Sequence, residues 1–272
     1  MNALPILVAA AAATGAGVAA WAAVHPTSEI FGPTLHHTPA SSSIALTFDD
    51  GPNPAFTPRL LDLLERYRVS ATFFLVGRFA RNFPELVREI ADRGHAVGNH
   101  TETHPNLAWM PAWRIVDELK ACQDSIFRAL NATRHSPSAF MRPPFGYRGP
   151  QLWSAVRSAR LRSVVMWSLG SFDWRHHSSE RLIERLGEVS KRSCCDSGAR
   201  DQSRVYFDQG RGERGGQIVL LHDGDFRQSG ADRPHVMAAL EYWLPRWRDS
   251  GFEFVTMDQL IAASSPQRSL AP

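Results

Sequence analysis

Short apolar runs alternate with longer amphipathic segments along most of the chain. The apolar runs are closed by turn residues or polar residues, which is typical of buried strands, and the amphipathic segments repeat their apolar positions with a helical period. Strands are predicted at 44–48, 71–77, 95–100, 139–142, 163–169, 217–222 and 252–256. Helices are predicted at 58–68, 84–93, 111–130, 150–159, 179–189, 233–248 and 257–263.

This alternation predicts an α/β fold. Strands that alternate with helices are usually parallel and joined by right-handed crossovers. About seven such units favour a distorted (β/α) barrel with about seven parallel strands over an open doubly wound sheet. No Gly-rich nucleotide-binding loop follows the first strand, which also weakens the open-sheet alternative. In a parallel barrel, functional residues gather at the carboxyl ends of the strands.

An uncharged segment precedes the alternating region. Ala3 to Val24 is rich in Ala, and the first positively charged side chain is Arg59. The segment predicts a signal peptide, with small residues from Ala20 to Ala23 as a cleavage site, or a membrane anchor. A buried helix of the domain is the third interpretation. The first two imply a secreted or periplasmic protein, or one attached to the outer face of a membrane through residues 3–24.

Composition sets the remaining boundaries. Residues 25–43 are rich in Pro, Thr and Ser and predict a linker. The main domain is expected at 44–263, followed by a tail at 264–272. Within the domain, 190–216 is polar, Gly- and Arg-rich and without a period, which predicts a surface insertion.

The bulk composition excludes some functions. The chain has 272 residues, a formal net charge of +3 and 43% hydrophobic residues, which is ordinary for a globular protein. No basic stripe with interleaved aromatic residues occurs, so nucleic acid is not an expected partner. The three cysteines, Cys122, Cys194 and Cys195, lack the spacing of a zinc site or a disulfide framework and are interpreted as free thiols.

Polar residues capable of chemistry follow five of the predicted strands. The first strand ends in Asp49-Asp50, and adjacent carboxylates favour a bound cation or acid–base chemistry, although Asp also caps turns. The other strand ends carry His100 and His104, then Arg142, then Asp173 and Trp174, then His222 and Asp223. Each group alone has a structural interpretation. Five groups at the same end of one barrel predict a single site.

These residue types favour metal-assisted hydrolysis. Two His four residues apart and one Asp from another strand form a metal face that leaves positions open, as a catalytic zinc site requires. One of the two acids is then expected to bind the metal and the other to act as general base. A separate His serves as general acid, and Arg142 keeps the free carboxylate ionised. The sequence therefore predicts hydrolysis of an amide or ester.

Five motifs resemble those of the polysaccharide deacetylases, the NodB-like carbohydrate esterases. They are Thr47-Phe48-Asp49-Asp50-Gly51-Pro52, His100-x-x-x-His104-Pro105, Arg142-Pro143-Pro144-Phe145-Gly146, Asp173-Trp174 and Leu220-Leu221-His222. The resemblance spans about residues 44 to 260. It implies a distorted (β/α) barrel and metal-dependent removal of acetyl groups from N-acetylated sugars.

The resemblance also implies a role for each matched residue. It makes Asp49 the general base, His222 the general acid, Arg142 the residue that orients the base, Asp50, His100 and His104 the metal ligands, the Phe145 backbone N–H an oxyanion donor, and Trp174 and Leu220 the walls around the acetyl methyl. In many members an Asp that tunes the acid His stands where this chain has Gly170. Either Asp173 or Asp223 is therefore expected to tune His222, or His222 is tuned less strongly than in those members.

The expected function is deacetylation of N-acetylglucosamine units in peptidoglycan or chitin-like oligomers by an exported or membrane-anchored hydrolase. The reaction is expected to be attack by a metal-bound water, with zinc as the metal and cobalt or nickel as alternatives. Exposed Trp109, Trp113 and Tyr147 are predicted to stack on sugar rings, with core packing as the alternative. An O-acetyl esterase, a deformylase acting on another glycan and an inactive glycan-binding module remain as alternative functions.

Overall fold

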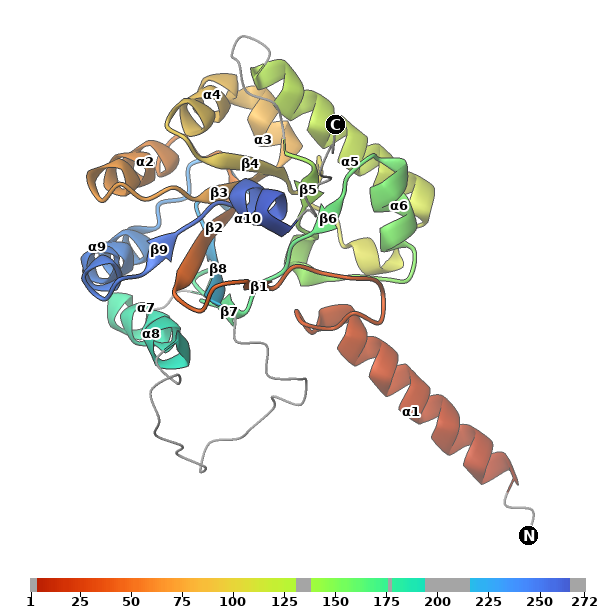
Figure 1. The fold of residues 1–272 in the computed structure, drawn as a ribbon. Coiled ribbons are helices and arrows are strands. Elements are labelled where there is room, and N and C mark those ends of the chain that lie inside the picture. The colour runs from red at the N-terminus through yellow and green to blue at the C-terminus, as the bar shows by residue number, and fades with distance from the viewer. Residues whose placement is uncertain (1–3, 131–137, 176–177, 194–215, 265–272) are drawn as a thin grey trace, which may run out of the picture.

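The computed structural model describes residues 4–130, 138–175, 178–193 and 216–264, and it describes side chains from Thr14 onward. Most of the predicted insertion at 190–216 and almost all of the predicted tail at 264–272 lie outside the described residues. Figure 1 shows a curled sheet with helices around its outside and the first helix, α1 (Leu4–Val24), extending away from it.

The sheet confirms the predicted distorted barrel of parallel strands. Its strands follow the order β1-β8-β2-β3-β4-β5-β6, with β7 paired to β8 and β9 paired to β2. Among the described strands, only the pairing of β1 with β8 is antiparallel. The strands are β1 (His37–Thr38), β2 (Ser43–Gly51), β3 (Thr72–Leu75), β4 (Ala96–Asn99), β5 (Phe140–Met141), β6 (Ser163–Val164), β7 (Leu169–Gly170), β8 (Gly216–His222) and β9 (Glu253–Phe254).

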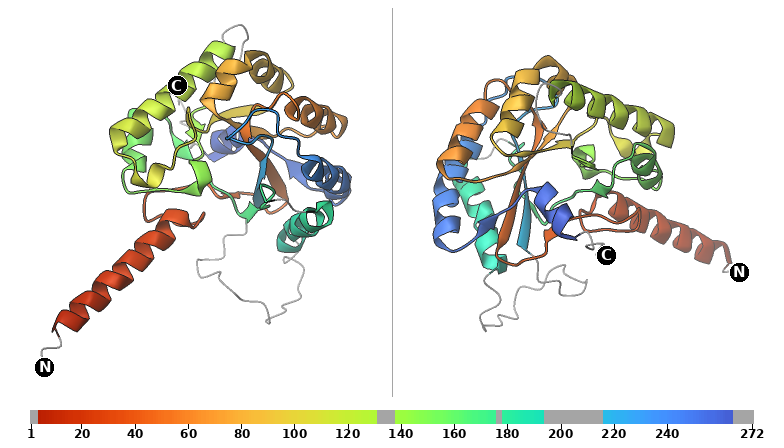
Figure 2. Two further views of the ribbon diagram at one scale, coloured as in Figure 1. Left: turned by 180° about the vertical axis from the view of Figure 1, so that it is seen from behind. Right: turned by 45° about the horizontal axis from the view of Figure 1, so that its top comes forward.

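Helices surround this sheet, as the two further views in Figure 2 show. They are α2 (Thr57–Arg66), α3 (Gly77–Asn82), α4 (Pro84–Asp92), α5 (Ala112–Leu130), α6 (Leu152–Ser158), α7 (Ser179–Leu186), α8 (Glu188–Ser193), α9 (Pro234–Asp249) and α10 (Met257–Ser264), with short 3-10 turns η1 (Leu107–Trp109) and η2 (Pro144–Gly146). The short helix α3 was not predicted, and the helix predicted at 179–189 is two helices, α7 and α8.

The strand predicted at 163–169 is also wrong in detail, because it breaks into β6 and β7. The carbonyl oxygens of Val165 and Met166 accept hydrogen bonds from the Arg142 side chain, at 3.3 and 2.9 Å, instead of from a neighbouring strand. A buried guanidinium therefore interrupts the ladder and ties this segment to the interior of the barrel.

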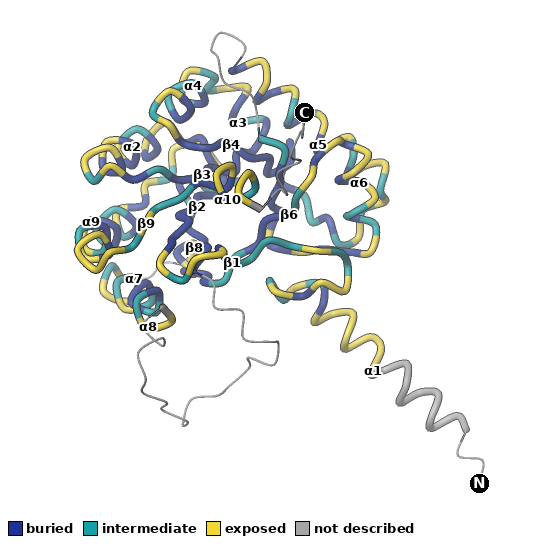
Figure 3. Tube along the Cα trace, viewed as in Figure 1, coloured by how far each residue is buried: buried dark blue, intermediate teal, exposed yellow. Residues whose placement is uncertain are grey.

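Strand β2 shows why polar side chains face the interior of the barrel near the carboxyl ends of the strands. Its alternate residues Ile44, Leu46 and Phe48 belong to the core between the sheet and the surrounding helices. Because successive side chains point to opposite faces of a strand, Thr47 and Asp49 face the interior, where Arg142 contacts both. Figure 3 shows these central strands as buried.

Helix α10 lies at the end of the barrel where the strands begin. The Met257 backbone N–H donates a 2.9 Å hydrogen bond to Oγ1 of Thr72, which is the first residue of β3. Met257 and Leu260 are buried in one apolar cluster with barrel residues such as Phe74. This end is filled with apolar side chains, so the opposite end, where the strands stop, is left for the predicted site.

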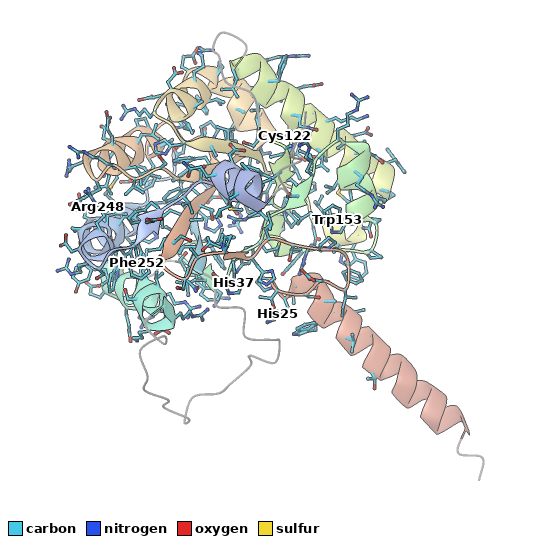
Figure 4. The ribbon with its side chains drawn as sticks, viewed as in Figure 1. His25, His37, Cys122, Trp153, Arg248 and Phe252 are labelled. Carbon is cyan, nitrogen blue, oxygen red and sulfur yellow. The ribbon has the colours of Figure 1, made fainter. Side chains whose placement is uncertain are left out.

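The segment after α1 belongs to the sheet. The predicted linker 25–43 contains β1, which pairs with β8, so the sheet begins before residue 44. Trp153 Nε1 donates to Pro33 O at 3.0 Å, and its ring fills the space that a Cβ at Gly32 (φ +116°) would need. Figure 4 labels Trp153 near this segment.

Arg148 fixes the last turn of α1 to the domain. Its buried guanidinium donates to the carbonyls of Ala22, Ser28 and His25, and its backbone N–H donates to Ala23 O at 3.0 Å. Ala22 is fully buried, whereas residues 14–21 are exposed, so that stretch of α1 is not a buried helix of the domain. No helix in the described part of the chain is both long and apolar enough to span a membrane.

Candidate active site

The two acids at the end of β2 face one site. Asp49 Oδ2 lies 3.8 Å from His100 Nε2, and Asp50 Oδ1 lies 3.4 Å from the same nitrogen. In a regular strand, the side chains of Asp49 and Asp50 would point to opposite faces of the sheet. The register between β2 and β3 shifts between Asp49 and Gly51, and Asp50 has a left-handed backbone with φ 71°. This irregularity of the strand end turns both carboxylates to the same side.

Three of the predicted residues form a candidate metal centre. One ligand atom each from Asp50, His100 and His104 can be chosen so that all lie within 4.8 Å of one another, and all three residues are buried. His100 and His104 come from the loop after β4, and Asp50 comes from the end of β2. The parallel order of these strands brings the three side chains to the same end of the barrel.

The donor set fits a divalent cation. Asp50 Oδ1 lies 3.1 Å from His104 Nε2 and has no hydrogen-bond partner among the described residues. The Nδ1 atom of His100 lies 2.8 Å from Arg142 O, which makes Nδ1 the protonated nitrogen and leaves the lone pair on Nε2 toward Asp50. Two imidazole nitrogens and one carboxylate are the ligand types of catalytic zinc sites with open positions.

Electrostatics in this group favour an ionised Asp50. Burial raises the pKa of the Asp50 carboxyl, but the imidazoles of His100 and His104 and the charge of His222 outweigh it, so the pKa is well below its ordinary value. Burial lowers the pKa of His104 despite its carboxylate neighbours. An anionic Asp and a neutral His are the protonation states that bind a metal ion.

Asp49 is held by Arg142. The Arg142 Nη1 atom donates to Asp49 Oδ1 at 2.8 Å and to Thr47 Oγ1 at 2.7 Å, and the residue is fully buried. Its guanidinium also lies 4.2 Å from the ring centre of Phe74. Oδ2 of Asp49 therefore remains on the side of His100, 3.8 Å from its Nε2.

His222 and Asp173 form a second buried pair. Asp173 Oδ1 lies 2.8 Å from His222 Nδ1, and Oδ2 accepts the His222 backbone N–H at 2.8 Å. Burial lowers the pKa of His222, but Asp173, together with Asp50 and Asp49, raises it to about 9. Asp173, not Asp223, is thus the carboxylate that contacts His222.

Asp223 lies outside this contact. Its Oδ2 accepts a hydrogen bond from Thr57 Oγ1 at 2.5 Å, and it sits where a Cβ at Gly51 would clash. Burial, reinforced by the charge of Asp50, raises the pKa of Asp223 to about 7. The residue supports the turn after Asp50.

Aromatic residues border the metal group on two sides. Phe145, in η2 with φ 59°, has its ring 4.6 Å from that of His104 and 5.7 Å from that of Tyr147. On the other side, the Trp174 ring lies 5.3 Å from His222. The predicted wall residue Leu220 is buried in β8 beside Thr47.

The exposure of the predicted sugar-stacking residues is mixed. Trp109 and Trp113 are largely exposed, whereas Phe145, Tyr147 and Trp174 are partly exposed. The stacking role predicted for Trp109, Trp113 and Tyr147 stays a prediction, as do the roles of the other site residues. What the structure adds is their arrangement around a single centre.

Two residues near the centre were missed by the sequence analysis. Thr47 shares the Arg142 guanidinium with Asp49, and its place in a strand motif gave only a weak signal. Phe226 stacks on His104 with the ring centres 4.0 Å apart and the planes 15° apart. Phe226 lies in the loop between β8 and α9, outside the five motifs, so no signal in the sequence indicated it.

Comparisons with known proteins identify relatives of the chain. A family model described as "Polysaccharide deacetylase" matches residues 36–164. The chain is similar to a chitooligosaccharide deacetylase of Bradyrhizobium sp., with 33% identity over 80% of this chain and 90% of the relative. It is also similar to a peptidoglycan-N-acetylglucosamine deacetylase of Bacillus cereus, with 30% identity over 80% of this chain and 87% of the relative.

A solved structure shows the same fold. It is a crystal structure of a peptidoglycan N-acetylglucosamine deacetylase in complex with 4-naphthalen-1-yl-N-oxidanyl-benzamide. The match has a TM-score of 0.66 and 29% sequence identity, and it covers 84% of this chain and 91% of that one.

Proposed function

The chain belongs to the polysaccharide deacetylase family and is a deacetylase, and we propose that it removes N-acetyl groups from N-acetylglucosamine units of a glycan in a metal-dependent hydrolysis. One observation carries the proposal: Asp50, His100 and His104 converge between the Asp49–Arg142 pair and the His222–Asp173 pair. Residues suited to hold a metal, to accept a proton and to give one therefore surround one point.

The metal would be held by Asp50, His100 and His104. A divalent cation there, with zinc as the proposed ion and cobalt or nickel as alternatives, would act as a Lewis acid on the acetamide carbonyl and lower the pKa of water. The donor set supports a metal of this type and does not distinguish among these three ions.

Asp49 is the proposed general base. Its Oδ1 is bound to Arg142, so Oδ2 is the oxygen that takes the proton from the attacking water. Arg142 does not lose its proton in proteins, so it places a permanent positive charge beside this carboxylate. Phe145, whose backbone N–H is the proposed donor to the oxyanion, is on the same end of the barrel.

His222 is the proposed general acid. Its Nδ1 is engaged by Asp173, which leaves Nε2 to give a proton to the departing amine. The pKa of about 9 keeps the imidazole protonated at neutral pH. The amine can then leave as a neutral group and acetate is released.

The substrate class rests on the relatives. Their names specify a chitooligosaccharide in one case and peptidoglycan N-acetylglucosamine in the other, and N-acetylglucosamine is common to both. We therefore propose a cell-wall or chitin-like glycan as the partner. Trp174 and Leu220 would enclose the acetyl methyl, and Tyr147 would contact a sugar ring.

Acetate release tests the proposal. Purified full-length protein would be incubated with chitooligosaccharides of several lengths, with peptidoglycan and with an O-acetylated glycan, before and after chelator treatment and zinc add-back. Release from the N-acetylated glycans that chelator stops and zinc restores is expected. Release only from the O-acetylated glycan would favour the esterase alternative. Release of formate from an N-formylated sugar would favour the deformylase. No release from any glycan by protein with metal bound would favour the binding module.

We propose in addition that the chain is exported. The support is the uncharged segment from residue 3 to 24, which forms α1. A fusion of residues 1–43 to a reporter that is active only outside the cytoplasm would give signal if this is correct, and a charged insertion within residues 10–14 would abolish it. A reporter that is inactive both in the original fusion and in the fusion with the charged insertion would contradict export.

A further inference from the structure

The two histidines of the metal centre are held in different ways. Nδ1 of His100 is anchored on the Arg142 carbonyl at 2.8 Å. Nδ1 of His104 is buried and has no hydrogen-bond partner among the described residues. A metal-binding His normally donates its second N–H to a carboxylate or carbonyl, and this bond sets the direction of the ring. The orientation of His104 must come from other contacts.

Two aromatic rings supply those contacts. Phe226 stacks on the His104 imidazole at a centre distance of 4.0 Å with the planes 15° apart. Phe145 meets the same imidazole edge-on at 4.6 Å and 78°, and it meets Phe226 at 5.3 Å and 88°. Aromatic pairs in such geometries attract each other beyond the effect of the apolar area they bury. The three rings form a closed cluster that leaves His104 little freedom to turn.

The loop that carries Phe226 is fixed from several elements. Arg78, from α3, donates through Nη2 to the Phe226 carbonyl. Asn53, from the turn after β2, and Arg233, at the start of α9, donate to backbone carbonyls of the segment 223–231 at 2.6 to 2.9 Å. The Arg227 guanidinium lies 5.3 Å from the Phe226 ring centre. The position of Phe226 is therefore determined by the fold around it.

We propose that Phe226 is a positioning residue that aligns His104 for metal binding by stacking, in place of the hydrogen bond that His100 has. The inference rests on the metal site of the proposed function. Replacing the ring with an aliphatic group of similar bulk keeps the space filled but removes the flat face. His104 can then turn about χ2, and its Nε2 is no longer held toward Asp50 Oδ1, which lies 3.1 Å away.

Metal affinity, measured without turnover, tests this role. Metal-stripped full-length proteins would be titrated with Zn²⁺ in the presence of a chromophoric chelator. Phe226→Leu is expected to weaken the affinity by about 10-fold, the scale of losing a partner of a ligand, whereas Phe226→Tyr keeps the stacking face and retains wild-type affinity. Urea unfolding of the metal-free forms would show whether each variant is folded.

Phe172→Leu is the matched control. Phe172 is 43% exposed and contacts Trp174 and Arg185 but none of the three ligands. Its substitution is expected to leave the affinity unchanged. Wild-type affinity in folded Phe226→Leu, equal losses in Phe226→Leu and Phe172→Leu, or a loss in Phe226→Tyr as large as in Phe226→Leu would each overturn the inference. A wild-type protein that binds no Zn²⁺ would instead overturn the metal site itself.

Discussion

Asp173 holds His222 at two points, through the ring at Nδ1 and through the backbone N–H, each at 2.8 Å. The contact with the ring raises the pKa of His222. The contact with the backbone N–H fixes the position of His222 at the end of β8. One carboxylate therefore fixes the position of the proposed acid and makes the largest contribution to raising its pKa.

Asp173→Asn is expected to move the alkaline limb of the kcat–pH profile downward. The pKa of His222 is about 9 because Asp173 and the other acids outweigh burial, which lowers it. Without the Asp173 charge the pKa falls, so the protonated form is lost at a lower pH, by at least about one unit. Ser171→Ala removes the 2.8 Å hydrogen bond to Asp173 Oδ1 and the 3.3 Å bond from the Asp173 N–H but keeps the Asp173 charge, so it serves as control and should shift the limb less. An unchanged limb in Asp173→Asn would contradict the assignment of His222 as acid.

Asp49→Asn should separate chemistry from metal binding. The carboxylate that accepts the proton is lost while Asp50, His100 and His104 remain, so kcat should fall by about 10²–10⁴-fold and bound zinc, measured by elemental analysis, should stay. Asp50→Asn is the paired variant and should lose zinc. If Asp49→Asn is the one that loses zinc, the assignments of the two acids are reversed.

Arg142→Gln should destabilise the fold as well as reduce activity. It leaves Asp49 as a buried charge without its cation and frees the carbonyls of Val165 and Met166. Removing one partner of a buried pair costs about 3–5 kcal/mol in free energy of unfolding, which urea denaturation would measure. Thr47→Val removes two hydrogen bonds, the one accepted from Arg142 Nη1 and the one donated to Val219 O, and should cost about 2 kcal/mol. Equal losses in the two variants would mean that Arg142 is not the counter-charge of Asp49.

The order of the strands and helices was predictable because the spacing of apolar residues differs between the two kinds of element. The end of the barrel that carries the site was predictable for the same reason, since the polar groups all follow strands. The turn of Asp50 toward Asp49 was not, because it depends on a register shift between β2 and β3. The break between β6 and β7 depends on a side chain from another strand, Arg142. Phe226 reaches His104 only through long-range contacts of its loop.

Acid should destabilise the fold through His95, away from the site. Burial, helped by Arg93, lowers the pKa of His95 to about 4, and its Nδ1 accepts the Ala71 N–H at 3.0 Å. Its folded pKa lies below the value of about 6.5 expected in the unfolded chain. The contribution to stability is therefore complete above about pH 6.5 and is lost as the pH falls toward 4, with a limit of about 3 kcal/mol.

His95→Asn tests this linkage, because Asn offers an acceptor at a similar position and does not titrate. Urea unfolding of the metal-free proteins at pH 7 and pH 4.5 would be compared. The wild type should lose about 2 kcal/mol more than the variant between these two conditions. Identical losses would show that His95 does not take up a proton on unfolding.

The hydrogen bonds from Arg148 to the end of α1 would hinder proteolytic cleavage of the chain at this point. A protease that cut between residues 20 and 23 would act on backbone whose carbonyls, those of Ala22 and Ala23, are already engaged by Arg148. A cut after Ala22 or Ala23 would remove acceptors from a guanidinium that burial already depresses to a pKa of about 10. A protease acting at these positions would compete with folding for the same few peptide groups, so such a cut would have to come before the hydrogen bonds to Arg148 form.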